Sequence, residues 1–159
     1  MRCPCINRKT ITNTVENMDL PTIANISPEL LKLSCVKPNL RENNKHLICD
    51  DASTNRELLD KFLQKLHCET DQAKNGFEAI EACVNNGVYK IVWMDIRMPR
   101  CDGIEATKLL RNKFAYKGII IAVTGYVDEA TRTECVEAGM NYFLQKPFDR
   151  NLIAHYANS

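Results

Sequence analysis

From Lys45 onward, short apolar runs alternate with longer segments whose apolar residues recur every three or four positions. Short apolar runs are typical of strands buried in a parallel sheet, and the longer spacing is typical of helices with one buried face. Five rounds of this alternation predict an α/β fold, a parallel sheet with helices on both faces. The expected strands are 46–49, 68–72, 89–95, 118–123 and 142–145.

The helices between these strands are expected at 53–66, 76–86, 104–112 and 128–138, with a last one ending near 157. The Asn75-Gly76 pair should open the second of them, while Gly87 and Gly139 should end the second and the fourth. The inward stripes are expected to be Leu58, Leu59, Phe62, Leu63 and Leu66; then Phe77, Ile80 and Val84; and finally Ala130, Cys135 and Ala138. The last stripe is thin, so the fourth helix should be loosely held.

Residues 1–44 lack a sustained helical or strand period and are rich in Asn, Thr and Pro. We therefore expect a mostly irregular N-terminal extension followed by one folded domain at 45–157. Within the extension, Ser27 followed by Pro28 predicts the start of a short helix at 28–34.

A net charge of +1 gives no basic face for nucleic acid. The longest apolar run, 118–123, is too short to cross a bilayer, and the N-terminus lacks the apolar centre of a signal peptide. We therefore expect a cytoplasmic or nuclear protein without membrane or nucleic-acid partners.

The chain has eight cysteines but no secretion signal, so most should be reduced thiols. Cys49 and Cys83 fall on apolar faces and are expected in the core. Cys3 and Cys5 have no matching Cys or His pair at the spacing of a zinc site, and we do not expect a metal there.

Polar residues follow four of the expected strands. Asp50 and Asp51 come after the first, Asp95 ends the third, Thr124 follows the fourth and Lys146 the fifth. Right-handed crossovers place the ends of parallel strands along one edge of the sheet, so these side chains should meet. Clustered carboxylates repel one another unless a cation joins them, and hard oxygen ligands suit Mg²⁺. The lysine and the hydroxyl would suit a phosphoryl ligand.

Each of these residues also has an ordinary structural explanation. The acidic pair could precede a helix start, Thr124 could be a strand-end hydroxyl, and Lys146 could be a solvated surface lysine. Their joint placement at the ends of four strands favours a site.

The segment from Lys45 to about Tyr156 resembles a receiver domain of a two-component response regulator or hybrid sensor kinase. The motifs that carry this resemblance are Asp50-Asp51 with Asn55-Arg56, Met94-Asp95-Ile96-Arg97-Met98-Pro99 with Asp102-Gly103, Thr124-Gly125, Ala138-Gly139 and Lys146-Pro147-Phe148. Its opening is similar to receivers of hybrid kinases and eukaryotic phosphorelays. Two departures are the polar second strand and the lack of an output domain after the last helix of this sequence.

The resemblance implies a flavodoxin-like sheet of order 2-1-3-4-5 and a cis Lys146–Pro147 bond. It further implies that Asp95 accepts the phosphoryl group and that Asp51, Asp95 and the backbone carbonyl of Arg97 hold Mg²⁺, with Asp50 acting through water. Thr124 and Lys146 would bind the phosphoryl oxygens, and Phe143 would be the aromatic residue whose rotamer changes.

The donor would be a phosphohistidine on a histidine kinase or a histidine-containing phosphotransfer protein. The chain would be a monomeric signalling protein rather than an enzyme, catalysing only its own phosphorylation and dephosphorylation. We also expect two large residues beside the phosphoryl group to slow its hydrolysis, with Arg97 holding the phosphoryl oxygens and Tyr126 covering the approach to Asp95. The alternative is that both side chains point into solvent.

Two competing functions remain. Phosphatases with an aspartate nucleophile need an acid/base aspartate two residues after it, where this chain has Arg97. A receiver-like binding module that is never phosphorylated would not need the complete set of site residues.

Overall fold

The computed structural model describes residues 28–33, 36–39, 41–126 and 128–159, without the side chains of 29–31. The chain divides between Cys35 and Val36, and the two parts are described separately. The described residues of the first part form a helix, α3 (Pro28–Leu33), within the range expected for a short helix. Ser27, its expected cap, and the Cys3-Cys5 pair lie outside the described residues.

The second part is a five-stranded parallel sheet of order β2-β1-β3-β4-β5, the order that the sequence resemblance implied. Its strands are β1 (Glu42–Cys49), β2 (Thr70–Ala73), β3 (Val88–Asp95), β4 (Ile119–Thr124) and β5 (Tyr142–Gln145). Its helices are α4 (Ser53–Lys65), α5 (Gly76–Asn86), α6 (Gly103–Asn112), α7 (Glu129–Ala138) and α8 (Arg150–Ala157).

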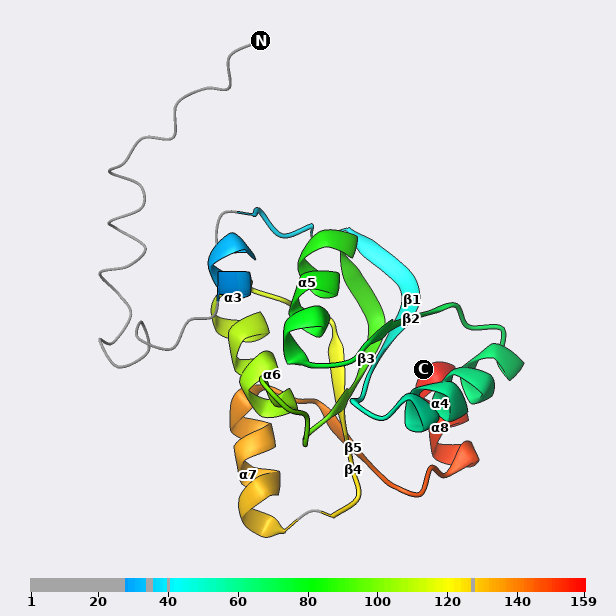
Figure 1. Cartoon of the computed structure of the whole chain (residues 1–159). Coiled ribbons are helices and arrows are strands. Elements are labelled where there is room, and N and C mark those ends of the chain that lie inside the picture. The colour runs from blue at the N-terminus through cyan, green and yellow to red at the C-terminus, as the bar shows by residue number, and fades with distance from the viewer. Residues whose placement is uncertain (1–27, 34–35, 40, 127) are drawn as a thin grey trace, which may run out of the picture. The chain divides into compact units, whose positions relative to one another are not determined.

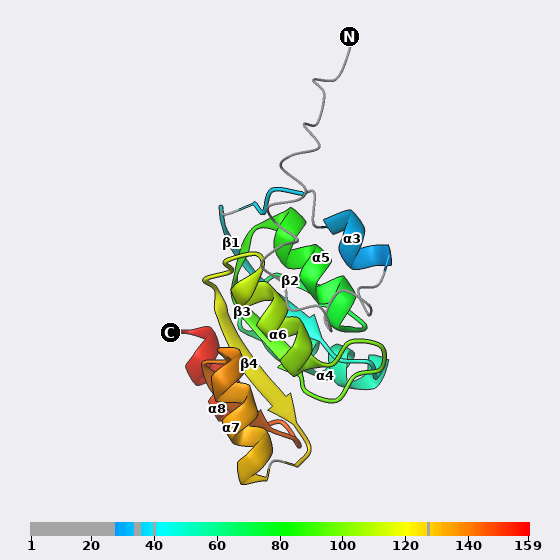
Figure 2. The ribbon, with the colours of Figure 1, turned by 90° about the vertical axis from the view of Figure 1, so that its left-hand side faces the viewer.

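The helices form two layers with the sheet between them (Figure 1). Helices α4 and α8 contact each other on one face, and α5, α6 and α7 form a row on the other (Figure 2). The α4/α8 face encloses a core around Ile48, Leu63 and Trp93, all at most 1% exposed. Among the described residues, no helix is long and apolar enough to cross a membrane.

Local chemistry explains where the helices begin and end. Asn75, Asp102 and Asp128 each accept a hydrogen bond from a backbone N–H in the first turn of α5, α6 and α7. Gly139 ends α7 with a φ of +96°, and Gly87 follows α5 with a φ of +98°, conformations in which glycine avoids the strain of a Cβ. The expected helix signals are therefore confirmed.

The first helix departs from its expected inward stripe. Leu58 is 44% exposed, whereas Arg56 is buried together with Leu59 and Leu63. Arg56, Leu59 and Leu63 are spaced by three and four residues and define the inner face, while Leu58 lies about 100° around the helix from Leu59. The prediction for Leu58 was wrong, and a charged residue takes a place in the stripe.

Smaller corrections concern other ends and faces. Strand β1 begins at Glu42, before the expected domain start at 45, because polar residues from Glu42 onward pair with the start of β3. Strand β2 begins only at Thr70, because His67 has a positive φ and the Cys68 N–H bonds back to Leu63. On α5, Phe77 is only partly buried. On α7, Ala130 is exposed, so the buried face of this helix is reduced to Cys135 and Ala138.

The five described cysteines are free thiols, and Cys49 and Cys83 are buried as expected. Burial raises the pKa of the Cys83 thiol to about 12, which keeps it protonated and poorly reactive.

Arg111 ties together several segments at the amino ends of β4 and β5. Its guanidinium donates hydrogen bonds to the backbone carbonyls of Tyr116 and Gly118 before β4, and to that of Gly139 before β5, at 2.7–3.0 Å. It also donates to the Asn141 side chain at 3.0 Å. One side chain therefore links the segments that lead into β4 and β5.

Candidate functional site

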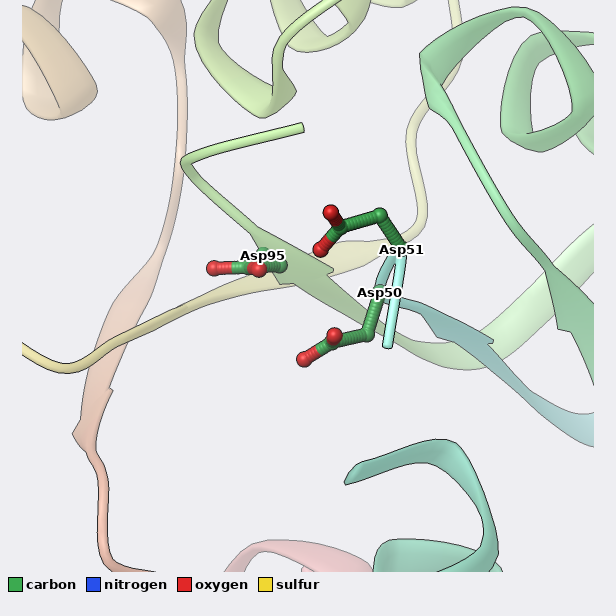
Figure 3. A group of neighbouring side chains, drawn as sticks. All are labelled: Asp50, Asp51 and Asp95. Atoms are coloured by element: carbon green, nitrogen blue, oxygen red, sulfur yellow. The ribbon is translucent and has the colours of Figure 1, made fainter. Parts of the chain in front are cut away.

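The opposite edge of the sheet gathers the predicted polar residues. Asp50 and Asp51 follow β1, Asp95 ends β3, Thr124 ends β4 and Lys146 follows β5. One carboxylate oxygen from each of the three aspartates lies within 4.8 Å of the others. Figure 3 shows these side chains at the ends of the two neighbouring strands β1 and β3. Asp50 and Asp95 are buried, whereas Asp51 is exposed to solvent.

Lys146 joins two of these carboxylates. Its Nζ lies 2.6 Å from Asp50 Oδ2 and 3.2 Å from Asp95 Oδ2. The lysine is positioned by the backbone, because its N–H donates to the Thr124 carbonyl at 2.7 Å. The Lys146–Pro147 peptide bond is cis, as the sequence resemblance implied.

Burial and neighbouring charges compete at this edge. Burial raises the pKa of Asp95, as does the Asp50 charge, while Lys146 acts in the opposite direction. Burial alone would lower the pKa of Lys146, but its contacts with Asp50 and Asp95 outweigh burial and raise it. Lys146 is therefore firmly protonated at neutral pH.

Asp50 is held by a dense set of donors. Its Oδ1 accepts from the Ala52 N–H at 2.9 Å, and the Asn55 amide donates to both carboxylate oxygens at 3.1 and 3.2 Å. By contrast, no hydrogen bond or ion pair from the described residues reaches the Asp51 carboxylate. Asp51 thus lacks the side-chain supports that hold Asp50.

Asp95 is constrained by the segment that follows β3. A backbone hydrogen bond from Arg97 reaches its carboxylate, and the Gly103 N–H donates to the Ile96 carbonyl at 3.0 Å. A Cβ on Gly103 would collide with the Asp95 carbonyl oxygen. The Asp102-Gly103 pair therefore serves two purposes, a cap for α6 and a close approach of that helix to Asp95.

The residues expected to respond to a phosphoryl group lie farther out. The buried Thr124 hydroxyl donates to the Tyr126 carbonyl at 2.9 Å and accepts from the Tyr126 N–H at 3.3 Å. Phe143 on β5 is partly buried, and the Arg132 guanidinium on α7 lies 4.9 Å from its ring centroid. Tyr126 is 78% exposed and Arg97 is also exposed, and the slow hydrolysis expected from these two residues stays a prediction.

The donor set fits a divalent cation. Three carboxylates face one ammonium group, so the negative charge of this cluster exceeds its positive charge. Hard carboxylate oxygens at a partly solvated edge are the ligands that Mg²⁺ prefers. Asp50, Asp51 and Asp95 are thus the residues that could hold it.

Comparison with known proteins identifies this arrangement. The family model for the response regulator receiver domain matches residues 47–158. The chain belongs to the response regulator receiver family. This receiver is 37% identical over 111 residues to the two-component response regulator 24 of Arabidopsis thaliana, covering 69% of this chain and 79% of that protein. It is 30% identical over 127 residues to the osmosensing histidine protein kinase SLN1 of Saccharomyces cerevisiae, covering 71% of this chain.

The receiver spans only 10% of the length of that yeast kinase. Among solved structures, it resembles a chain in the Saccharomyces cerevisiae complex of the histidine phosphotransfer protein Ypd1 with the receiver domain of the response regulator Ssk1. The TM-score is 0.64 at 27% identity, with 75% of this chain and 86% of that chain covered. The family places this chain in two-component phosphorelay signalling.

Sequence reasoning missed the residues behind the acidic pair. Asn55 and Arg56 belong to the motif that carries the resemblance, but the sequence pattern predicts no role for either. Gln72, which accepts a hydrogen bond from Arg56, is predicted only to lie in a polar strand. The available signal was a charged residue in register with the apolar stripe of α4.

Proposed function

We propose that Asp95 of this receiver accepts a phosphoryl group from a phosphohistidine on a histidine kinase or a histidine-containing phosphotransfer protein. The observation that carries the proposal is the position of its buried carboxylate, 3.2 Å from Lys146 and beside the Asp50-Asp51 pair. Asp95 ends β3, the central strand of the sheet, whereas Asp50 and Asp51 follow the neighbouring strand β1.

In the transfer step, a carboxylate oxygen of Asp95 attacks phosphorus while the bond from phosphorus to the imidazole nitrogen breaks. The imidazole keeps the bonding electron pair, and a new P–O bond forms an aspartyl phosphate. Lys146, already within reach of Asp95, shifts its contact to the phosphoryl oxygens. When bound, Mg²⁺ supplies positive charge to the same oxygens; Asp51, Asp95 and the Arg97 carbonyl would hold it, and Asp50 would act through water.

Phosphorylation then acts as a switch through Thr124 and Phe143. The Thr124 hydroxyl must give up the Tyr126 carbonyl to reach a phosphoryl oxygen, so the loop after β4 changes its hydrogen bonding. Phe143 turns inward into the space that this movement leaves. Helix α7 buries only Cys135 and Ala138, so its displacement requires little free energy.

The partner assignment is supported by the similarity of this chain to a histidine protein kinase and to a chain of the complex between the histidine phosphotransfer protein Ypd1 and the Ssk1 receiver domain. We propose that this chain is a monomeric phosphoacceptor whose only catalysis concerns its own phosphoryl group. A phosphorylated receiver would then bind its next partner through a surface altered by the switch.

The test is phosphorylation with acetyl phosphate and Mg²⁺, followed by Phos-tag electrophoresis and mass spectrometry. Wild type should be retarded, and Asp95→Asn should not. Asp102→Asn is the matched control, because asparagine also caps a helix and this side chain caps α6 through Glu105. Modification of Asp50, Asp51 or a serine would contradict the assignment, and lack of any modification would favour the unphosphorylated binding module.

A further inference from the structure

Arg56 is a buried cation held by neutral groups. Its side chain lies on the inner face of α4 and the residue is 8% exposed. Nη1 donates to the Asp50 carbonyl at 2.7 Å and to the Asp51 carbonyl at 3.2 Å, and Nε donates to Gln72 Oε1 at 3.2 Å. No carboxylate of the described residues forms an ion pair with it. A guanidinium placed in this way fixes backbone rather than compensating a side-chain charge.

The two carbonyls belong to the consecutive aspartates of the site. A hydrogen bond to each carbonyl fixes the orientation of the peptide plane that follows it, and therefore the direction in which the adjacent side chains leave the backbone. Asp50 has further supports in Ala52, Asn55 and Lys146. Asp51 has none at its carboxylate among the described residues, so it depends most on its backbone.

Gln72 connects this arrangement to β2. The strand is polar, with the sequence Thr-Asp-Gln-Ala, and Gln72 pairs with Ile48 of β1 near the acidic edge. The Gln72 amide oxygen holds Nε, which leaves Nη1 directed at the two carbonyls. An apolar residue at this position would provide no acceptor for Arg56 Nε, which gives a reason for one polar residue in this unusually polar strand.

We infer that Arg56, oriented by Gln72, is a positioning residue that fixes the Asp50-Asp51 backbone so that Asp51 is directed toward a divalent cation. The inference rests on the proposed function for the identity of that cation as Mg²⁺. Arg56 itself does not touch the ion.

The experiment measures the Mg²⁺ dissociation constant of the full chain by NMR, from the backbone amide shifts of Asp51 and Asp95. Loss of a residue that orients metal ligands typically weakens metal binding by about 10-fold to 100-fold, and we expect about 10-fold for Arg56→Met. Arg56→Lys keeps the positive charge and one carbonyl contact but loses the several fixed donors of the guanidinium. It should therefore bind Mg²⁺ more tightly than Arg56→Met but less tightly than wild type. Gln72→Leu should have a smaller effect in the same direction.

Arg111→Met is the matched control, because Arg111 also donates to several backbone carbonyls, but at the amino ends of β4 and β5. It should lower the melting temperature without changing the Mg²⁺ affinity. In the metal-free protein, Arg56→Met should also shift the Asp51 amide resonance, whereas Arg111→Met should not.

The inference is overturned if Arg56→Met and Arg56→Lys both bind Mg²⁺ as wild type does, or if Arg111→Met weakens binding equally. A wild type that binds no Mg²⁺ would overturn it as well. Failure of Asp95 phosphorylation is read separately by Phos-tag, because the titration uses Mg²⁺ alone.

Discussion

The fully buried His46 should make the stability of this receiver fall more steeply with acid than its carboxylates alone would. Its Nδ1 accepts a hydrogen bond from Trp93 Nε1 at 3.2 Å, so Nε2 carries the proton of the neutral ring. Nε2 has no partner among the described residues. Burial, followed by the nearby Lys90 charge, lowers the pKa of His46 from 6.5 to about 4.

The direction in which stability changes with pH follows from proton binding. The unfolded chain binds a proton at this histidine near pH 6.5, whereas the folded chain does so only near pH 4. Acid therefore favours unfolding, and stability is lost as the pH falls from about 7 toward 4. Between pH 7 and pH 5 the loss from this group is about 2 kcal/mol.

The loss of about 2 kcal/mol is an upper bound, because the surroundings of His46 admit water. His46 lines a cavity of about 610 Å³ at the amino ends of β1 and β3, together with Lys45, Glu69 and Lys90. Water in this cavity would solvate a charged imidazole and reduce the loss.

The assay is urea unfolding at pH 7, 6 and 5 for wild type and His46→Gln, whose amide oxygen can still accept from Trp93. The stability difference between the two proteins should change by about 2 kcal/mol in favour of the variant as the pH falls, since other groups cancel in the comparison. The exposed His155, changed to Gln, is the control and should show no such change. A pH-independent difference between wild type and His46→Gln would refute the reasoning.

Two further predictions concern the site. Gly103→Ala should destabilise the fold by about 1–3 kcal/mol in urea unfolding, because the new Cβ would collide with the Asp95 carbonyl and with Met94. Gly125→Ala is the control, because the space around its Cβ is open. Equal losses of stability in the two variants would contradict the steric explanation. Arg132→Met removes a cation–π contact with Phe143 worth about 0.5–1 kcal/mol. If this contact opposes switching, beryllofluoride should bind the variant about two to five times more tightly than wild type. Arg150→Met, which removes a similar contact with Phe62, is the control, and equal affinities of Arg132→Met and wild type would argue against this role.

The sequence predicted the sheet and its polar edge because both depend on local signals. Apolar runs locate the strands, and the parallel crossovers bring Asp50, Asp95 and Lys146 together whatever the details of packing. The roles proposed for these residues stay predictions, although their proximity is established.

Features that depend on tertiary partners were not predictable in the same way. The period of α4 could not tell that Arg56 would be buried and Leu58 exposed, because that choice depends on the Asp50 and Asp51 carbonyls and on Gln72. Likewise, β2 is polar because its side chains have partners elsewhere. Asp71, for example, accepts hydrogen bonds from Lys45 and Tyr89.

The anchoring by Arg111 has a mechanical consequence for signalling. Its guanidinium holds the Gly139 carbonyl at the C-terminal end of α7, while the N-terminal end of that helix follows the loop after Thr124. One end is thus held to the body of the domain, and the other adjoins the loop after β4, which we propose as part of the switch. Helix α7 should therefore move as a lever, with its fulcrum at Gly139 and its largest excursion beside Asp128.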